Sequence, residues 1–125
     1  MKTNNDLGIF INKKRIQKQI SLRNLSRQIG ISAEYLSKIE NGLRPAPSIE
    51  ILEKITIQLL LSPQEKEIMY DLAAESKPYL SLAPDLLVYI NENKSIHKAL
   101  RLAKRCEANE EDWQVFIEFL TNKYL

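Results

Sequence analysis

The 125 residues suit one domain or two small helical ones, and no apolar run approaches the roughly 20 residues that a membrane-spanning helix needs. The single cysteine excludes an internal disulfide framework and a multi-cysteine metal site. The first residues do not resemble a secretory signal peptide, so we expect a cytoplasmic protein.

The formal net charge of +2 is distributed unevenly along the chain. Residues 1–60 carry ten Lys or Arg against five Asp or Glu, a net charge of +5. Residues 61–125 carry eight against eleven, a net charge of −3. We therefore expect a polyanion to meet the front half, and the back half to be too acidic for a second surface of this kind. A chance distribution of charge is the alternative.

Helical periodicity recurs along the chain and strand patterns are weak, which predicts an all-α fold. The first helix should cover residues 7–18, with Ile9, Phe10 and Ile16 on its apolar side. Two short helices follow, over residues 22–29 and 33–41, and Ser21 and Ser32 are placed to cap them. Gly30 should make the tight turn between the two helices.

Gly42 is placed to end the third helix, and the prolines that follow cannot continue it. Ser48 should cap a fourth helix over residues 49–60. Ser62-Pro63-Gln64-Glu65 is a capping box with proline at the first helical position, and it predicts a fifth helix that ends near residue 75.

The back half should contain three more helices. They are expected over residues 85–93, over 96–107 after a Ser95 cap, and over 110–124 after an Asn109 cap. The proline-bounded stretch 76–84 is the predicted linker. We therefore expect a first domain over residues 1–75 and a helical C-terminal region over 85–125.

The second and third helices must cross steeply, because a glycine turn is too short for antiparallel packing. Ser26 would lie at their closest approach. The shared inner face should comprise Leu25, Ile29, Ile31, Leu36 and Ile39. This arrangement leaves four residues of the third helix pointing outward, namely Ala33, Glu34, Ser37 and Lys38.

The run SLRNLSRQIGISAEYLSKIENGLRPAPSIEILEKI resembles the lambda-repressor-like helix-turn-helix of the XRE (Cro/cI) type. The resemblance covers about residues 7–60. It implies a five-helix DNA-binding domain whose third helix enters the major groove. A small helical extension would follow this domain.

The resemblance also implies roles for individual residues. The base-reading positions are Ala33, Glu34, Ser37 and Lys38, and the matching family pair to Arg15 and Glu40 is a structural ion pair. Lysine can donate to guanine, glutamate can accept from cytosine, and alanine can touch a thymine methyl. The alternatives are a solvated Glu34–Lys38 pair and an Arg15 that contacts phosphate.

The candidate phosphate contacts are Lys14, Ser21, Arg23, Tyr35, Asn41 and Arg44. Many phage relatives carry Gln or Thr where this chain has Leu22, so one contact would be missing or moved to Arg23. Arg44 could instead enter the minor groove, and Asn41 could simply help to end the helix.

The last predicted helix is apolar over much of its circumference. The candidate dimerisation residues are Trp113, Phe116, Ile117, Phe119 and Leu120. Since helix-turn-helix proteins read two half-sites as two-fold dimers, we expect a homodimer. The alternative is that this helix closes a core within its own chain.

No catalytic, metal or cofactor site is expected, and the chain is not predicted to be an enzyme. His97 lacks a second metal ligand at a suitable spacing, and Cys106 should be a small buried residue. The predicted function is a sequence-specific regulator of transcription that binds double-stranded DNA, and specifically a repressor. The alternative is an antitoxin whose back half sequesters a toxin as its protein partner.

Overall fold

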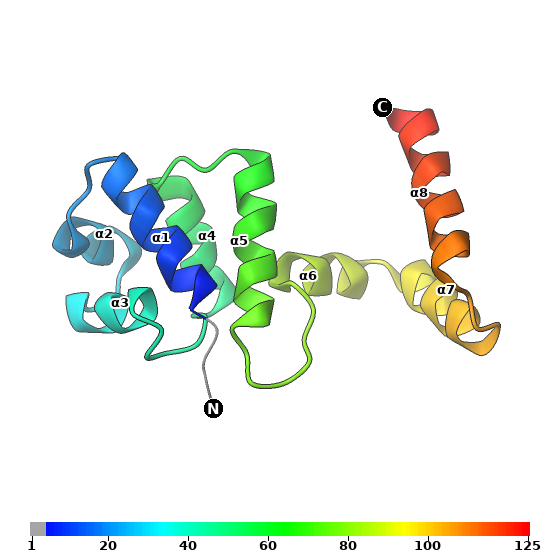
Figure 1. Cartoon of the computed structure of the whole chain (residues 1–125), viewed down its shortest axis with the longest axis horizontal. Coiled ribbons are helices and arrows are strands. Elements are labelled where there is room, and N and C mark those ends of the chain that lie inside the picture. The colour runs from blue at the N-terminus through cyan, green and yellow to red at the C-terminus, as the bar shows by residue number, and fades with distance from the viewer. Residues whose placement is uncertain (1–4) are drawn as a thin grey trace. The chain divides into compact units, whose positions relative to one another are not determined.

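The computed structural model describes residues 5–125, and within that range the chain forms eight α-helices and no strand (Figure 1). The helices are α1 (Asp6–Gln17), α2 (Leu22–Ile29), α3 (Ala33–Glu40), α4 (Ile49–Gln58), α5 (Pro63–Glu75), α6 (Pro84–Glu92), α7 (Lys94–Arg105) and α8 (Glu110–Tyr124). The all-α prediction is confirmed. None of the helices in residues 5–125 has both the length and the apolarity of a membrane span.

The chain divides into two compact units, the first ending at Leu87 and the second spanning Val88–Leu125. Residues 76–83, where the sequence predicts a linker, contain no helix. Ser76 and Ala83 at the two ends of this stretch are nevertheless buried. The predicted domain boundaries themselves stay a prediction.

Helices α1–α5 build the core of the first unit. In it, α2 lies against α3 and α4, and α1 lies against α3 and α5. Fully burying one large aliphatic side chain contributes about 1.5–3 kcal/mol before conformational entropy is counted. The fully buried side chains are Ile11, Leu25, Ile29, Leu36, Ile39, Leu52, Ile55, Leu59 and Met69. This core fixes α2 and α3 against the rest of the unit.

The predicted apolar face of α1 is right for Phe10, which packs against the core, and wrong for Ile9 and Ile16. Ile9 and Ile16 are more than half exposed, whereas Leu7, Gly8 and Ile11 are buried. The reason is that α1 turns polar Arg15 inward as well, so hydropathy alone misplaces the buried face. Gly8 is required there, because an added Cβ would lie 2.4 Å from the Ile39 carbonyl oxygen.

Five predicted N-caps form as expected. In each, the side chain accepts a hydrogen bond from the backbone N–H three residues further on. These caps are Ser21, Ser32, Ser48, Ser62 and Asn109. Asp112 also completes an unpredicted capping box at α8, accepting from the Asn109 N–H at 2.9 Å.

Two predictions in the second unit are wrong. Helix α7 begins at Lys94 rather than after Ser95, because Asn93 adopts an extended backbone and its side chain donates to the Tyr89 carbonyl at 2.8 Å. Cys106 is exposed rather than buried, because it follows the last residue of α7 and no element covers it.

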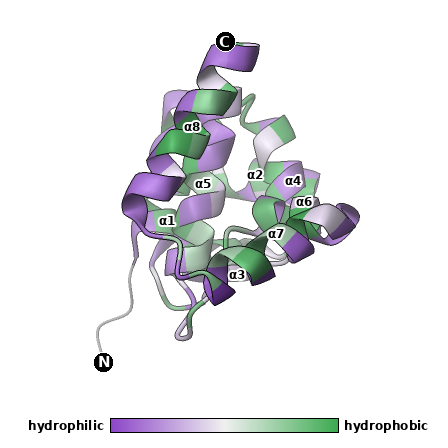
Figure 2. Cartoon of the chain, turned by 90° about the vertical axis from the view of Figure 1, so that its right-hand side faces the viewer, coloured by the Kyte–Doolittle hydropathy of each residue, from purple (hydrophilic) through white to green (hydrophobic). Residues whose placement is uncertain are grey.

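The second unit has no buried residue anywhere in Val88–Leu125. Figure 2 shows apolar positions distributed along α8. Trp113 remains 38% exposed and Phe119 56% exposed. The intrachain core that would have closed around α8 is therefore not formed by this unit alone.

Candidate nucleic-acid interface

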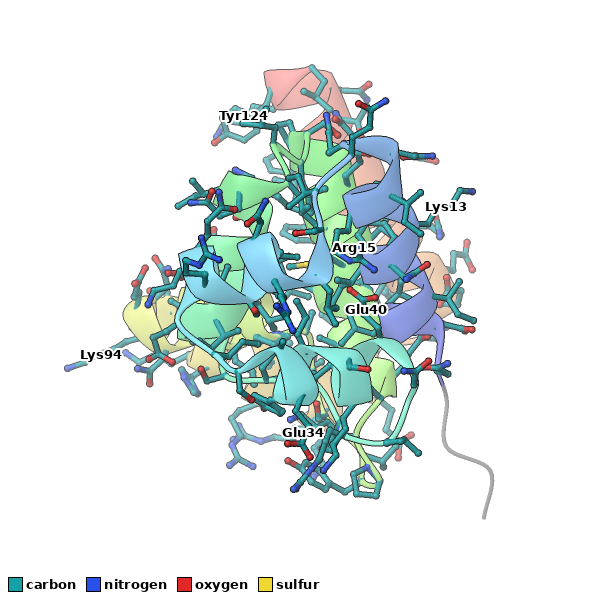
Figure 3. All side chains as sticks on the ribbon, turned by 90° about the vertical axis from the view of Figure 1, so that its left-hand side faces the viewer. Lys13, Arg15, Glu34, Glu40, Lys94 and Tyr124 are labelled. Atoms are coloured by element: carbon teal, nitrogen blue, oxygen red, sulfur yellow. The ribbon has the colours of Figure 1, made fainter. Side chains whose placement is uncertain are left out.

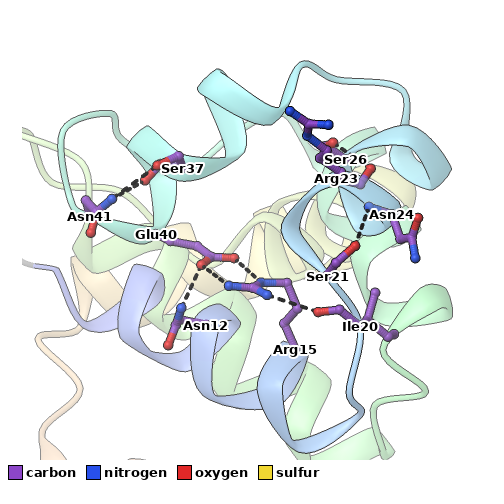
Figure 4. Close-up of polar contacts among 10 residues, drawn as sticks. All are labelled: Asn12, Arg15, Ile20, Ser21, Arg23, Asn24, Ser26, Ser37, Glu40 and Asn41. Carbon is purple, nitrogen blue, oxygen red and sulfur yellow. Dashed lines mark hydrogen bonds and ion pairs between the residues drawn. The ribbon is translucent and has the colours of Figure 1, made fainter.

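The turn between α2 and α3 is set by Gly30. Its φ of 77° is left-handed, and the next amide, Ile31 N–H, donates to the Ser26 carbonyl at 3.0 Å. Ser26 is buried, and its hydroxyl donates to the Arg23 carbonyl at 2.9 Å (Figure 4). The Ser26 hydroxyl is therefore hydrogen-bonded where the two helices approach each other. The steep crossing is thus specified by a few small residues.

Helix α3 has one buried side and one accessible side. Leu36 and Ile39 are buried in the core. On the other side lies Glu34, which Figure 3 labels. The Glu34 side chain is 79% exposed and the Lys38 side chain 40% exposed. Ala33 and Ser37 are partly exposed. All four predicted base-reading residues therefore have accessible surface.

Glu34 and Lys38 pair with each other across one helical turn, with 3.2 Å between Oε1 and Nζ. An exposed pair at this spacing is worth only about 0.3–0.5 kcal/mol. A good bidentate contact to a base is worth about 1–3 kcal/mol. The ion pair is therefore too weak to hold Lys38 away from a base edge.

Arg15 and Glu40 form a two-pronged ion pair between α1 and α3 (Figures 3 and 4). Arg15 Nε lies 2.8 Å from Glu40 Oε2, and Nη2 lies 3.0 Å from Oε1. Arg15 Nη1 also donates to the Ile20 carbonyl at 3.0 Å. The hydrogen bond to Glu40 raises the pKa of Arg15 above its ordinary value. These contacts keep Arg15 away from any outside phosphate.

The end of α3 is closed by Gly42. Its φ of 74° lets the Leu43 N–H donate to the Lys38 carbonyl at 2.8 Å. The Asn41 side chain turns back and donates to the Ser37 carbonyl at 2.9 Å (Figure 4). Asn41, a predicted phosphate contact, is thus engaged with its own helix.

The loop after α3 carries the exposed side chain of Arg44. Between Pro45 and Pro47, which have no N–H, the Ala46 N–H donates to Ser76 Oγ at 3.0 Å. Lys77 Nζ donates to the Ala46 carbonyl at 3.0 Å. Both polar groups of Ala46 are therefore fastened to the end of α5.

The other predicted phosphate contacts differ in availability. The side chains of Arg23 and Arg44 make no hydrogen bond or ion pair within residues 5–125. Ser21 caps α2 and leaves the first amides of that helix for an outside acceptor. Tyr35 packs partly against the core. Arg23 and Arg44 are thus the best-placed cations of the set.

Lys14 already has an ion-pair partner within the chain. It forms an ion pair with Glu65, whose carboxylate also accepts from the Ser62 N–H at 2.9 Å. The hydrogen bond from Lys14, and then the one from the Ser62 backbone, lower the pKa of Glu65 to about 2. Lys14 would have to leave this pair in order to reach a phosphate.

Three contacts of this surface escape sequence reasoning. Asn12 Nδ2 donates to Glu40 Oε1 at 2.8 Å, and the spacing of three residues between Asn12 and Arg15 was a usable signal. Ser76 and Lys77 lie thirty or more residues from Ala46 along the chain. No local pattern marks such a contact.

The predicted dimerisation residues are all at least partly exposed in the second unit. Trp113, Phe116 and Leu120 line a groove of about 590 Å³ together with residues of α6 and α7. Ile117 and Phe119 do not line it and are each more than half exposed. The groove and these two side chains form one continuous apolar region of α8 and its neighbours.

Comparison with known proteins matches residues 11–66 to a helix-turn-helix family model. The HTH-type transcriptional regulator SinR of Bacillus subtilis is 39% identical over 56 residues, which is 45% of this chain and 50% of SinR. The HTH-type transcriptional regulator Rv0474 of Mycobacterium tuberculosis is 37% identical over 71 residues, 57% of this chain and 48% of that relative. The chain thus spans about half the length of the curated relatives it matches.

The ImmF control region 10 kDa protein of Bacillus phage phi105 is 40% identical over 55 residues, 44% of this chain and 60% of that protein. Among solved structures, the complex of the SinR and SinI proteins superposes with a TM-score of 0.48 at 24% identity. That match covers 94% of this chain and 96% of the other.

Proposed function

We propose that the chain is a sequence-specific regulator of transcription that binds double-stranded DNA, because residues 11–66 match a helix-turn-helix family model and resemble HTH-type transcriptional regulators. We propose further that it is a repressor, which places α3 in the major groove of a two-fold operator. Two of its relatives carry the name of HTH-type transcriptional regulators.

The observation that carries the proposal is the difference between the buried and the accessible sides of α3. Leu36, Ile39 and Glu40 are committed to the core and to the Arg15 ion pair. The remaining side, with Glu34 and Lys38, is accessible and bears polar groups that can read base edges. A surface helix that only packs shows the same division, so recognition is favoured here by the match of residues 11–66 to a helix-turn-helix family model.

The backbone of the DNA would be held from both sides of α3. Arg23 stands at the start of α2, where unpaired amides also favour an anion. Arg44 follows the end of α3 on the loop fastened by Ser76. Such contacts fix register without reading sequence, so they complement the base contacts.

Homodimerisation through the second unit is part of this proposal. A two-fold operator needs two copies, and the side chains of Trp113, Phe116 and Phe119 offer exposed apolar surface that a partner would cover. A second copy supplies a matching surface automatically. An antitoxin role, in which a different protein covers this region, is the alternative.

The experiment begins with selection of bound duplexes from a random pool, using the full chain. We expect a two-fold sequence whose half-sites lie about one helical turn apart. Lys38→Ala should then weaken binding by about 1–3 kcal/mol and relax the preference at one base pair of each half-site. Arg44→Ala is the matched control, because it should weaken binding to all duplexes alike.

Two results would contradict the proposal. A pool that yields no enriched sequence would remove sequence-specific binding altogether. An enriched operator whose preferences are untouched by Lys38→Ala would remove α3 as the reader.

A further inference from the structure

Helix α7 concentrates positive charge. Its twelve residues, KSIHKALRLAKR, contain five Lys or Arg and no Asp or Glu. Lys94, Lys98, Arg101 and Arg105 recur at intervals of four, three and four, so they share one face of the helix. Lys104 flanks this stripe. All five residues are exposed, and Figure 3 shows the Lys94 side chain reaching away from the ribbon.

None of these five cations is neutralised within the part of the chain that the structure describes. The ion pairs there are Lys14–Glu65, Arg15–Glu40 and Lys38–Glu34, all in the first unit. Like charges one turn apart on a helix are mutually destabilising. The stripe therefore carries an electrostatic cost that an anionic partner would remove.

The opposite face of α7 lines the groove that the proposed dimer would cover. Ile96, Ala99, Leu100 and Ala103 line the groove shared with α8. A basic helix that binds a lipid surface needs its apolar face free to enter the bilayer. If a second copy covers this groove, as in the proposed dimer, the apolar face is not free to enter a bilayer, and the stripe fits a polyanion contacted through charge alone.

We propose that α7 is a second, sequence-independent contact to the DNA backbone, made by Lys94, Lys98, Arg101, Lys104 and Arg105. This inference rests on the proposed function, in which the first unit holds the duplex. The second unit follows directly after Leu87, so DNA bound by the first unit is presented to α7 at a high effective concentration.

The dimensions of the stripe suit a DNA backbone. From Lys94 to Arg105 the helix rises about 16 Å, which matches roughly five phosphate steps along one strand. The net charge of residues 61–125 does not reveal this surface. Acidic residues before and after α7 bring that net charge to −3. The expectation that the back half is too acidic to bind DNA follows from that net charge. The positive charge concentrated in α7 leads us to revise it.

The test compares the full chain with the variant Lys98→Gln/Arg101→Gln/Arg105→Gln. The dependence of log K on log salt concentration is measured for the selected operator and for an unrelated duplex. Each lost phosphate contact should flatten the slope by about 0.9. Between 50 and 200 mM salt the wild-type chain should therefore lose about 40-fold more affinity than the variant, per bound chain.

The matched control keeps the charge, as Lys98→Arg/Arg101→Lys/Arg105→Lys, and should retain the wild-type slope. The ratio of operator to unrelated affinity should stay the same in all three proteins, because backbone contacts carry no sequence information. Circular dichroism and the midpoint of urea unfolding establish that the three proteins fold alike.

A slope unchanged by the glutamine variant, with operator preference intact, would overturn the inference and leave the proposed function standing. A wild-type chain that binds no duplex would overturn both. If the variant changes the sedimentation coefficient, the stripe meets acidic residues of a second copy, and the inference fails. Loss of binding to phosphatidylserine vesicles with an unchanged DNA slope would assign α7 to a lipid surface and would equally overturn it.

Discussion

At Glu40, three donors converge on one buried carboxylate. Arg15 supplies Nε and Nη2, and Asn12 supplies its amide, all within 3.0 Å. Only 5% of the Glu40 side chain is exposed, so water cannot replace a lost partner. This residue ties the last turn of α3 to α1.

We expect Glu40→Ala to lower the free energy of unfolding by about 3–5 kcal/mol, because it leaves the half-buried Arg15 without its counter-ion. Urea unfolding followed by circular dichroism measures the change. Replacing both partners, as Arg15→Met/Glu40→Leu, should cost less than the single change. Glu34→Ala is the control, since its ion pair is exposed and should matter by less than about 1 kcal/mol. Equal losses for Glu40→Ala and Glu34→Ala would contradict this account.

Among the elements, the loop between α3 and α4 depends most on distant support. It carries Arg44 and offers one backbone donor between its two prolines, the Ala46 N–H. Ser76 Oγ accepts from that donor, and the Ser76 hydroxyl in turn donates a hydrogen bond to the Ala73 carbonyl at 2.7 Å. The loop is thus fastened to the end of α5.

Ser76→Ala should lower the free energy of unfolding by about 1–3 kcal/mol, because it leaves the buried Ala46 N–H without an acceptor. Hydrogen exchange of the Ala46 amide should accelerate, and operator affinity should fall alike on all sequences. Ser81→Ala is the matched control in the same segment, where the side chain is exposed. If the Ala46 amide exchanges at the same rate in both variants, Ser76 does not hold the loop through this hydrogen bond.

Element boundaries were predicted well where local chemistry sets them. Helices α2, α5 and α8 begin and end where expected, because serine or asparagine caps mark their starts. The start of α7 was missed, because the extended Asn93 and its bond to Tyr89 compete with the Ser95 signal. Local sequence does not show which of two adjacent capping residues prevails.

The buried face of α1 could not be found from hydropathy. Gly8 and Arg15 lie on that face because of what α3 presents to them, a pair of backbone carbonyls and the carboxylate of Glu40. The same limitation applies to the candidate interface. The accessible side of α3 followed from its periodicity, whereas the support of the Arg44 loop by Ser76 depends on a contact thirty residues away.

At the scale of the whole molecule, the two units differ in how they are held together. The first has a continuous core drawn from α1–α5, whereas the second has no buried residue between Val88 and Leu125. The proposed dimer would cover the apolar region of the second unit.

Sedimentation of the full chain should therefore give a dimer, and Phe116→Glu/Phe119→Glu should give a monomer, because carboxylates would be buried in the interface. Asn122→Glu, on the same helix, is the control and should leave the dimer intact. A full chain that sediments as a monomer at every concentration would contradict the homodimer. Recovery of a stable complex only with a second, different protein would favour the antitoxin alternative.

The absence of a buried core in residues 88–125 has a further consequence for how binding depends on the concentration of the protein. If pairing supplies the cover that the helices of residues 88–125 lack, then their ordering and the pairing of two chains are one event. At low protein concentration most copies would be monomers in which residues 88–125 are loosely ordered. Few copies would then be dimers that bind both half-sites of an operator. Occupancy would then rise more steeply than the amount of protein, so a modest change in synthesis could switch the target gene.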